Sequence, residues 1–285
     1  MKSVTGRDVR RELLPGQSPA LLRELHLLTR TGDLNADARR KLKQINHFFG
    51  LLQPALDAIG RDGHAPLAID AGAGNAYLGF VLHELWLGPL GRGDLWSVEA
   101  RPELAAQGEA RQARLGVQRM RFVTRQVADL WPAPGTTTVE GRRVDAVVAL
   151  HACDTATDDA LVLGIRAEAA VIAVVPCCQA EVARQLSGAD AALAGIGTLW
   201  RHGLHRREFG AHLTNVLRAL VLESHGYEVT VTELVGWEHS AKNELILGRK
   251  TQRGNPMARR QLDGLLATLP PLRLRLLTAL RPADH

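Results

Sequence analysis

The chain has 285 residues and a formal net charge of +5 at pH 7, and 46% of its residues are hydrophobic but only 4% are aromatic. This length suits one large domain with appended segments, and the scarcity of aromatic residues argues against a binding surface made of stacked rings. The positive charge favours a polyanionic partner such as RNA. No apolar run is long enough to span a membrane, and residues 1–11 lack the apolar core of a signal peptide. We therefore expect a cytoplasmic protein without membrane association.

Residues 1–64 are expected to form a helical N-terminal extension. Ser18 followed by proline is typical of a helix start, and Asn35 is a plausible cap for a second helix over residues 36–59. Basic residues crowd the start of that second helix, where they form either a solvated face or a patch that contacts phosphates. They are Arg39, Arg40, Lys41 and Lys43.

Residues 65–250 alternate short apolar runs with helix-length segments, which predicts a doubly wound α/β sheet. Helices are expected over residues 77–87, 102–115, 158–168 and 213–225. Strands are expected over residues 67–70, 94–99, 120–126, 146–150 and 170–175, followed by an antiparallel hairpin over 228–236 and 244–249. The remaining residues, 251–285, alternate Leu and Arg at helical spacing and are expected to form a helix or a helix pair.

A glycine turn follows the first predicted strand. The sequence Asp70-x-Gly72-x-Gly74 opens a helix, so that the backbone can approach a ligand closely at the positive end of the helix dipole. The next glycine, Gly79, comes five positions after Gly74, so the G-x-G-x-x-G spacing of a dinucleotide site is not met. Glu99 ends the second predicted strand, where a carboxylate can accept both hydroxyls of an adenosine ribose.

The glycine turn, Glu99 and the predicted order of strands resemble the class I S-adenosylmethionine-dependent methyltransferases, over roughly residues 66–250. The resemblance implies a Rossmann-like seven-stranded methyltransferase sheet with a terminal antiparallel hairpin. It also implies that Glu99 binds the ribose of S-adenosylmethionine and that Gln126 and Val127 border the adenine. The residues implied at the methionine end are Asp70, Gly72, Gly74, Asn75 and His151.

A narrower resemblance lies after the fourth and fifth predicted strands. His151-Ala-Cys153-Asp154-Thr-Ala-Thr-Asp158, Pro176-Cys-Cys-Gln179 and Ala241-Lys-Asn-Glu244 are similar to segments of methyltransferase-like proteins and of tRNA ribose 2′-O-methyltransferases. Asp154 stands where that pattern has glycine. The resemblance implies that these loops face the methyl group and its acceptor, which favours RNA as the substrate.

Methyl transfer requires the acceptor to be positioned and, for a weak nucleophile, to lose a proton. His151 and Asp154 are the candidate bases. Asp154 also suits the methionine ammonium or the cap of a helix that starts near residue 156. Cys177 and Cys178 either pack in a tight turn or supply a thiolate that attacks a pyrimidine. Zinc binding with Cys153 and His151 ranks last because no C-x₂-C spacing exists, so no metal is expected.

A basic run, His202 to Arg207, precedes the last long predicted helix and is expected in a loop beside the carboxyl edge of the sheet.

Together these features predict an S-adenosylmethionine-dependent methyltransferase acting on RNA. Two alternatives remain open: a methyltransferase for a protein or a small molecule, and a non-catalytic scaffold that binds the cofactor.

Overall fold

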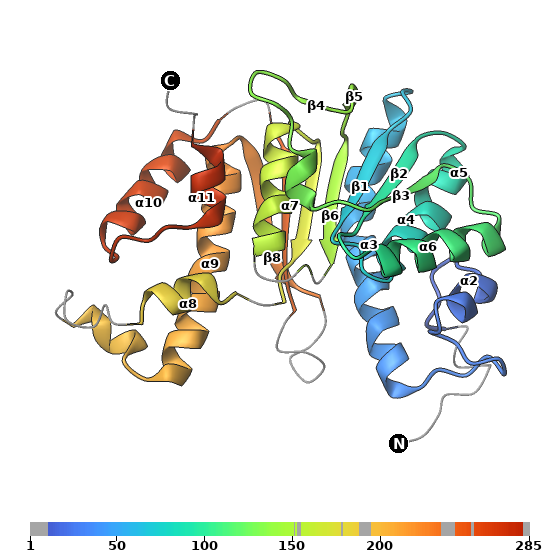
Figure 1. Ribbon diagram of the computed structural model, residues 1–285, viewed down its shortest axis with the longest axis horizontal. Helices are drawn as coiled ribbons and strands as arrows, with labels where there is room; N and C mark the ends of the chain where they lie inside the picture. Colours follow the sequence, from blue (N-terminus) through green and yellow to red (C-terminus); the bar gives the residue numbers. More distant parts are fainter. Residues whose placement is uncertain are drawn as a thin grey trace.

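The protein is described by a computed structural model over residues 11–150, 152, 155–177, 179–187, 195–234, 243–251 and 254–281. A seven-stranded sheet in the order β3-β2-β1-β6-β7-β9-β8 lies between two layers of helices (Figure 1). The strands of this sheet are β1 (Leu67–Ala71), β2 (Asp94–Val98), β3 (Met120–Val123), β6 (Ala146–Leu150), β7 (Val171–Val175), β8 (Tyr227–Glu233) and β9 (Glu244–Lys250).

Five strands run parallel, and the last two do not. β1 pairs with β2 and β6, β2 pairs with β3, and β6 pairs with β7, all in parallel. β9 pairs antiparallel with both β7 and β8. β1 and β7 are buried at every position, as expected for parallel strands covered on both faces. The predicted seven-stranded methyltransferase-type sheet with a terminal antiparallel hairpin is therefore confirmed.

The protein has two hydrophobic cores, and each lies between one face of the sheet and one layer of helices. Alternate residues of each strand point to opposite faces, so Ala68 belongs to one core and Leu67 and Ile69 belong to the other. The first layer contains α2 (Pro19–Glu24), α3 (Ala36–Arg61), α4 (Tyr77–Leu82) and α6 (Pro102–Leu115). The second contains α7 (Thr155–Arg166), α9 (Gly203–Ser224), α10 (Pro256–Ala267) and α11 (Arg275–Leu280).

Helix α3 packs directly on the sheet, and both N-terminal helices start at residues that cap them. Ser18 Oγ accepts the amide of Leu21, and Asn35 Oδ1 accepts the amide of Ala38, so the helix start predicted at Ser18 and the cap predicted at Asn35 are both present. Leu42, like most apolar residues of α3, lies in the same core as the first face of the sheet. Helix α3 therefore forms a wall of the domain that contains the glycine turn.

Predicted and observed helix boundaries agree best where the residues at the helix ends themselves favour a start or a stop. α6 begins at Pro102 and is capped by Gly116 at φ +63°, as its sequence predicts. The helix expected over residues 77–87 is wrong in detail, because α4 gives way to a π-helical turn, His83–Leu87, and then to α5 (Gly88–Leu90). Five further short elements were not predicted: η2 (Val127–Leu130), β4 (Thr138–Val139), β5 (Arg142–Arg143), α8 (Glu181–Gln185) and η3 (Ile196–Trp200).

The basic run before the last long helix is not in a loop. α9 starts at Gly203, ten residues earlier than predicted, with His202 as its N-cap. The exposed Leu204 (58% exposed) breaks the apolar pattern of the first turn, so hydrophobic periodicity did not reveal it. Within the part of the chain that the structure describes, no helix combines the length and the apolar character that a membrane span needs.

Candidate functional site

The glycine turn brings backbone amides to the end of the neighbouring strand. Gly72 and Gly74 have φ angles of +70° and +56°, in the left-handed region that glycine adopts without a steric penalty. The amide of Ala73 donates to the carbonyl of Val98 at 2.9 Å, and the amide of Gly74 donates to Glu99 Oε2 at 2.8 Å. The turn after β1 is thus tied to the end of β2.

Glu99 is 6% exposed, and protein donors reach both of its oxygens. Oε1 accepts the amide of Arg101 at 3.0 Å and its Nε at 2.8 Å, while Oε2 accepts Nη2 of Arg101 at 3.3 Å in addition to Gly74. Burial alone raises the pKa of a carboxyl group, but these hydrogen bonds outweigh it and hold the pKa of Glu99 below its ordinary value. The end of β2 therefore carries a negative charge at neutral pH.

Asp70 lies near the end of β1 and is 2% exposed. Its Oδ2 accepts the amide of Gly79, in the first turns of α4, at 3.1 Å. Burial raises the pKa of Asp70 to about 7, although the Gly79 hydrogen bond opposes this shift, and the negative charge of Glu99 raises the pKa further. A cation bound beside Asp70 would favour its ionised form.

Gly79 fits between α4 and the sheet only because it has no side chain. A Cβ at this position would lie 2.8 Å from Ser97 Oγ and 3.0 Å from Asp70 Oδ2. The sequence shows Gly79 as a glycine at the wrong spacing for a dinucleotide motif. In the structure it allows the helix to approach β1 and β2 closely, so that its amide reaches Asp70.

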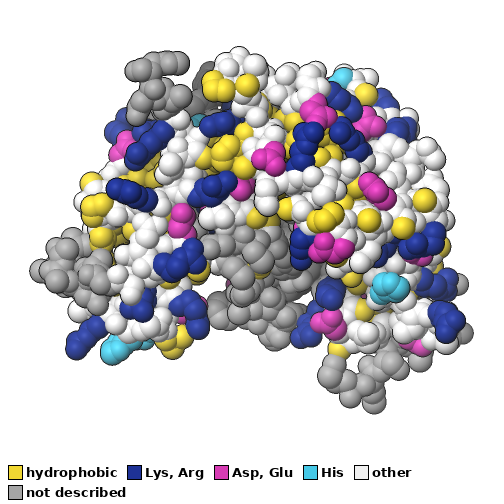
Figure 2. Space-filling model, in the orientation of Figure 1, with side chains coloured by type: hydrophobic (Ala, Val, Ile, Leu, Met, Phe, Trp, Pro, Cys, Tyr) yellow, Lys and Arg dark blue, Asp and Glu magenta, His cyan; other side chains and the backbone are white. Residues whose placement is uncertain are grey.

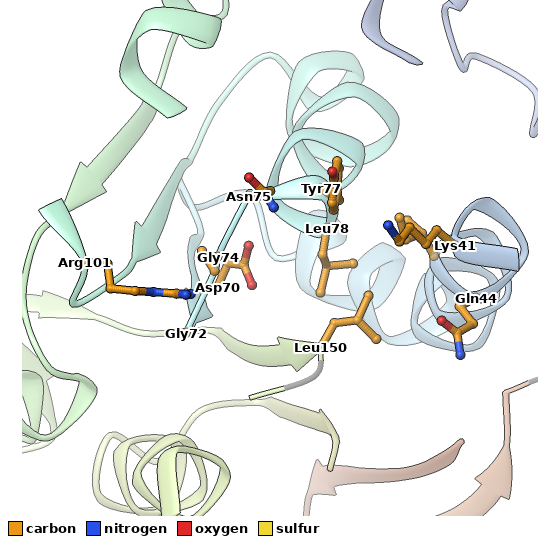
Figure 3. A pocket seen from close by; sticks show the side chains of 12 residues that line it. Lys41, Gln44, Asp70, Gly72, Gly74, Asn75, Tyr77, Leu78, Arg101 and Leu150 are labelled. Atoms are coloured by element: carbon orange, nitrogen blue, oxygen red, sulfur yellow. The ribbon is translucent and has the colours of Figure 1, made fainter. Parts of the chain in front are cut away.

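A cavity of about 290 Å³ opens beside these groups (Figure 3). This volume is close to the lower end of the range for small-molecule sites. Arg101 extends toward Gly74 and Asp70 on one side, while Lys41 and Gln44 project from α3 on the other. The lining residues are Lys41, Gln44, Ile45, Asp70, Gly72, Ala73, Gly74, Asn75, Tyr77, Leu78, Arg101 and Leu150.

The cavity joins several of the predicted cofactor residues and also includes residues that the sequence did not indicate. Asp70, Gly72, Gly74 and Asn75 line it together, and Glu99 accepts a hydrogen bond from the turn. Gln126 and Val127 follow β3 outside this lining, where Gln126 caps η2. The wall formed by α3 was missed, because an amphipathic helix does not reveal which element its half-buried residues face.

The predicted acceptor side is described only in part. His151, Cys153, Asp154, Cys178 and Lys242 lie outside the described residues. Leu150, at the end of β6, lines the cavity. Cys177 has a half-buried thiol that donates to the carbonyl of Ala152 at 3.9 Å. The assignment of His151, Asp154, Cys177 and Cys178 to catalysis stays a prediction.

A buried polar network connects α7, α9, β9 and the segment that follows β7. No sequence motif indicated this network. Arg218 of α9 is 1% exposed and donates to Asp158 of α7 at 2.8 Å and to Asn215 at 3.2 Å. Asn215 donates to Glu244 at 3.0 Å and accepts from Gln179 at 3.4 Å. Asp158, in the first turn of α7, is the buried partner of Arg218.

The donors and acceptors around the cavity suit a nucleoside joined to an amino acid. The ionised carboxylate of Glu99 suits a ribose diol, and the buried carboxyl group of Asp70 suits an ammonium group, whose charge would favour the ionised form of Asp70. Gly74 leaves room for close approach, since a Cβ built on it would come within 4.0 Å only of Arg101 Nη2. These features fit S-adenosylmethionine, the cofactor that the sequence resemblance implies.

Comparison with known proteins identifies the family. A family model described as a methyltransferase domain matches residues 40–185, more than half of the 285 residues. No curated protein sequence matches the chain.

Solved structures with a similar arrangement include an rRNA methylase from Streptococcus thermophilus, with 12% identity, coverage of 70% of this chain and 97% of that chain, and a TM-score of 0.43. An SAH-bound methyltransferase from Podospora anserina has 17% identity, coverage of 86% and 93%, and a TM-score of 0.46. The magnesium protoporphyrin IX methyltransferase of Synechocystis PCC 6803 with bound SAH has 14% identity, coverage of 81% and 93%, and a TM-score of 0.42. On the strength of the family match, this chain belongs to the family of methyltransferase domains.

Proposed function

We infer that this protein transfers a methyl group from S-adenosylmethionine to RNA. The observation that carries the cofactor assignment is the hydrogen bond from Gly74 to Glu99 at the edge of a cavity, in a chain that belongs to a methyltransferase family. This contact places a charged acceptor for ribose hydroxyls against a turn that can approach a ligand closely. The two features therefore act as one binding site.

Glu99, Asp70 and the glycine turn hold the two ends of the cofactor in this proposal. The four lone-pair positions of the Glu99 carboxylate are occupied by Gly74 and Arg101, so the ribose hydroxyls replace the Arg101 side chain there. That side chain is 62% exposed and can swing toward solvent. Asp70 faces the methionine ammonium, whose positive charge favours ionised Asp70.

When bound, S-adenosylmethionine supplies a methyl group activated by its sulfonium. The chain then has to orient the acceptor and remove its proton. We assign the proton acceptor to His151 or Asp154, and we keep attack by Cys177 or Cys178 on a pyrimidine as the alternative. Separate substitutions Cys177→Ser and Cys178→Ser distinguish these routes, because a nucleophilic thiolate is indispensable to turnover and a packing thiol is not.

Basic residues on two helices support RNA as the acceptor. The start of α3 carries Arg40, whose side chain is 54% exposed, and the start of α9 carries Arg207, whose side chain is 69% exposed. In Figure 1 both helix starts lie at the lower end of the molecule, on either side of the sheet. Figure 2, in the same orientation, shows Lys and Arg side chains at the lower left and the lower right of the molecule. Two basic walls around the carboxyl edge would contact phosphates on both sides of an acceptor base or ribose.

Labelled methyl transfer tests this function. The protein is incubated with methyl-labelled S-adenosylmethionine and, separately, with RNA, protein and small-molecule fractions from cells that lack it. We expect label in RNA, with an apparent affinity that falls steeply as salt rises. Label only in the protein or small-molecule fraction would overturn the RNA assignment. Binding of the cofactor without any transfer would favour a scaffold.

A cytoplasmic setting, in which the Cys177 thiol stays reduced, fits this proposal.

A further inference from the structure

We propose that helix α3 completes the cofactor site and that Lys41 binds the carboxylate of the methionine half of S-adenosylmethionine. This inference rests on the proposed function and extends it to the N-terminal helices. The cavity has two walls of different origin, the glycine turn after β1 and one face of α3. Nothing in the sequence motifs of the turn requires the second wall.

The face of α3 that borders the cavity is fixed in place. Lys41, Gln44 and Ile45 are spaced three and four residues apart, so they share one side of the helix. Leu42 and Phe48, on the adjacent side, are both fully buried in the core. Figure 3 shows Lys41 extending from α3 toward Tyr77 across the cavity from Asp70. Helix α3 therefore holds Lys41 at the cavity as a constant part of the fold.

Charge explains what Lys41 does there. Among the described residues that line the cavity, the positively charged side chains are those of Lys41 and Arg101. Arg101 pairs with Glu99 at the ribose end, and the ribose hydroxyls displace its side chain toward solvent when the cofactor binds. An α-amino acid carries one ammonium and one carboxylate group. Asp70 can pair with the ammonium group, but the carboxylate group needs a positively charged partner. Lys41 supplies this positive charge from the opposite wall of the cavity.

The existing partner of Lys41 is weak enough to be exchanged. Its Nζ lies 3.0 Å from Asp37 Oδ2, four residues earlier in the helix, and the two side chains are 49% and 62% exposed. Exposed ion pairs of this kind contribute little to stability, because water screens the two charges. A ligand carboxylate held in place by the rest of the cofactor therefore competes well with Asp37 for the ammonium group.

The test compares two ligands that differ only by the carboxylate, S-adenosylmethionine and its decarboxylated analogue. Their affinities are measured by calorimetry for the wild type, Lys41→Ala, Lys41→Arg and Lys43→Ala. Lys43 is exposed on the same helix and does not line the cavity, so it is the matched control for net charge. We expect Lys41→Ala to weaken S-adenosylmethionine binding by about fivefold and to leave the analogue unchanged. Lys41→Arg should restore most of the loss, and Lys43→Ala should change neither ligand.

Each other outcome contradicts a different claim. Equal weakening of both ligands by Lys41→Ala, or no weakening of either, would overturn the carboxylate contact while leaving the proposed function in place. An equal effect of Lys43→Ala would reduce the role of Lys41 to general electrostatic attraction and overturn its specific contact. Failure of the wild type to bind either ligand would overturn the proposed function itself, and the inference with it.

Discussion

The backbone amide of Gly74 and the carboxylate of Glu99 are joined by a hydrogen bond of 2.8 Å, across the boundary between β1 and β2. The two residues are 25 positions apart in the chain and meet because β1 and β2 pair in parallel, with Ala71 opposite Val98. The carboxyl ends of both strands therefore reach the same edge of the sheet. A glycine turn and a strand-end acid, each common on its own, are thereby brought into direct contact.

Glu99→Gln should sharply weaken cofactor binding. Glutamine keeps the shape of the side chain but loses the charge and one of the two acceptor oxygens. Hydrogen bonds to charged groups contribute about 1.5–3 kcal/mol, so we expect the affinity for S-adenosylmethionine to fall by about tenfold to 100-fold. Calorimetric titration measures this. Glu103→Gln, at an exposed position in the first turn of α6, is the control and should bind as the wild type does.

Asp70 should give the fold a distinct pH dependence. Its pKa is raised to about 7 in the folded protein, above its value in the unfolded chain. Folding therefore opposes ionisation, so stability from this residue is present at low pH and is lost as pH rises from about 4 to about 7. Between pH 5 and pH 8 the free energy of unfolding should fall by about 2–3 kcal/mol more in the wild type than in Asp70→Asn. Urea denaturation at the two pH values measures the difference, and parallel behaviour of the two proteins would exclude this role.

Gly79→Ala should destabilise the protein because the added Cβ would lie 2.8 Å from Ser97 Oγ. Overpacking of this kind costs about 1–3 kcal/mol. Gly50→Ala is the matched control, since Gly50 lies inside α3 with nothing within 4 Å of an added Cβ. That substitution should stabilise the fold by about 0.5–1 kcal/mol through helix propensity. Thermal denaturation should move in opposite directions for the two variants, and a shared direction would contradict the packing argument.

Arg218→Met should cost far more stability than the loss of an exposed arginine. Removing Arg218 leaves Asp158 charged and buried, which destabilises proteins by about 3–5 kcal/mol. Arg207→Met, at a 69% exposed position paired with Glu208, should change stability by less than about 0.5 kcal/mol. Chemical denaturation of the two variants tests the network. Similar small losses in both would mean that Arg218 is not required to position α7 against α9.

Features encoded by nearby residues were predictable from the sequence. Pro102 and Gly116 mark the two ends of α6, and Ser18 and Asn35 cap the helices they precede. The parallel sheet followed from the alternation of apolar runs and helical segments. Glu99 was found because it ends a short apolar strand at a recognisable distance from the glycine turn.

Features that depend on long-range contacts were not predictable. The pairing of Arg218 with Asp158 spans 60 residues, and neither side chain differs in the sequence from an ordinary surface charge. The start of α9 was missed because its first turn does not bury an apolar face. The role of Gly79 depends on Ser97 in β2, and the proposed role of Lys41 depends on the position of α3 at the cavity.

The structure of the protein with bound S-adenosylhomocysteine tests the central claim most directly. We predict that the ribose hydroxyls contact Glu99 in place of the Arg101 side chain, and that the amino-acid end lies between Asp70 and Lys41. A ligand bound elsewhere, with Glu99 still held by Arg101, would contradict the account of this site.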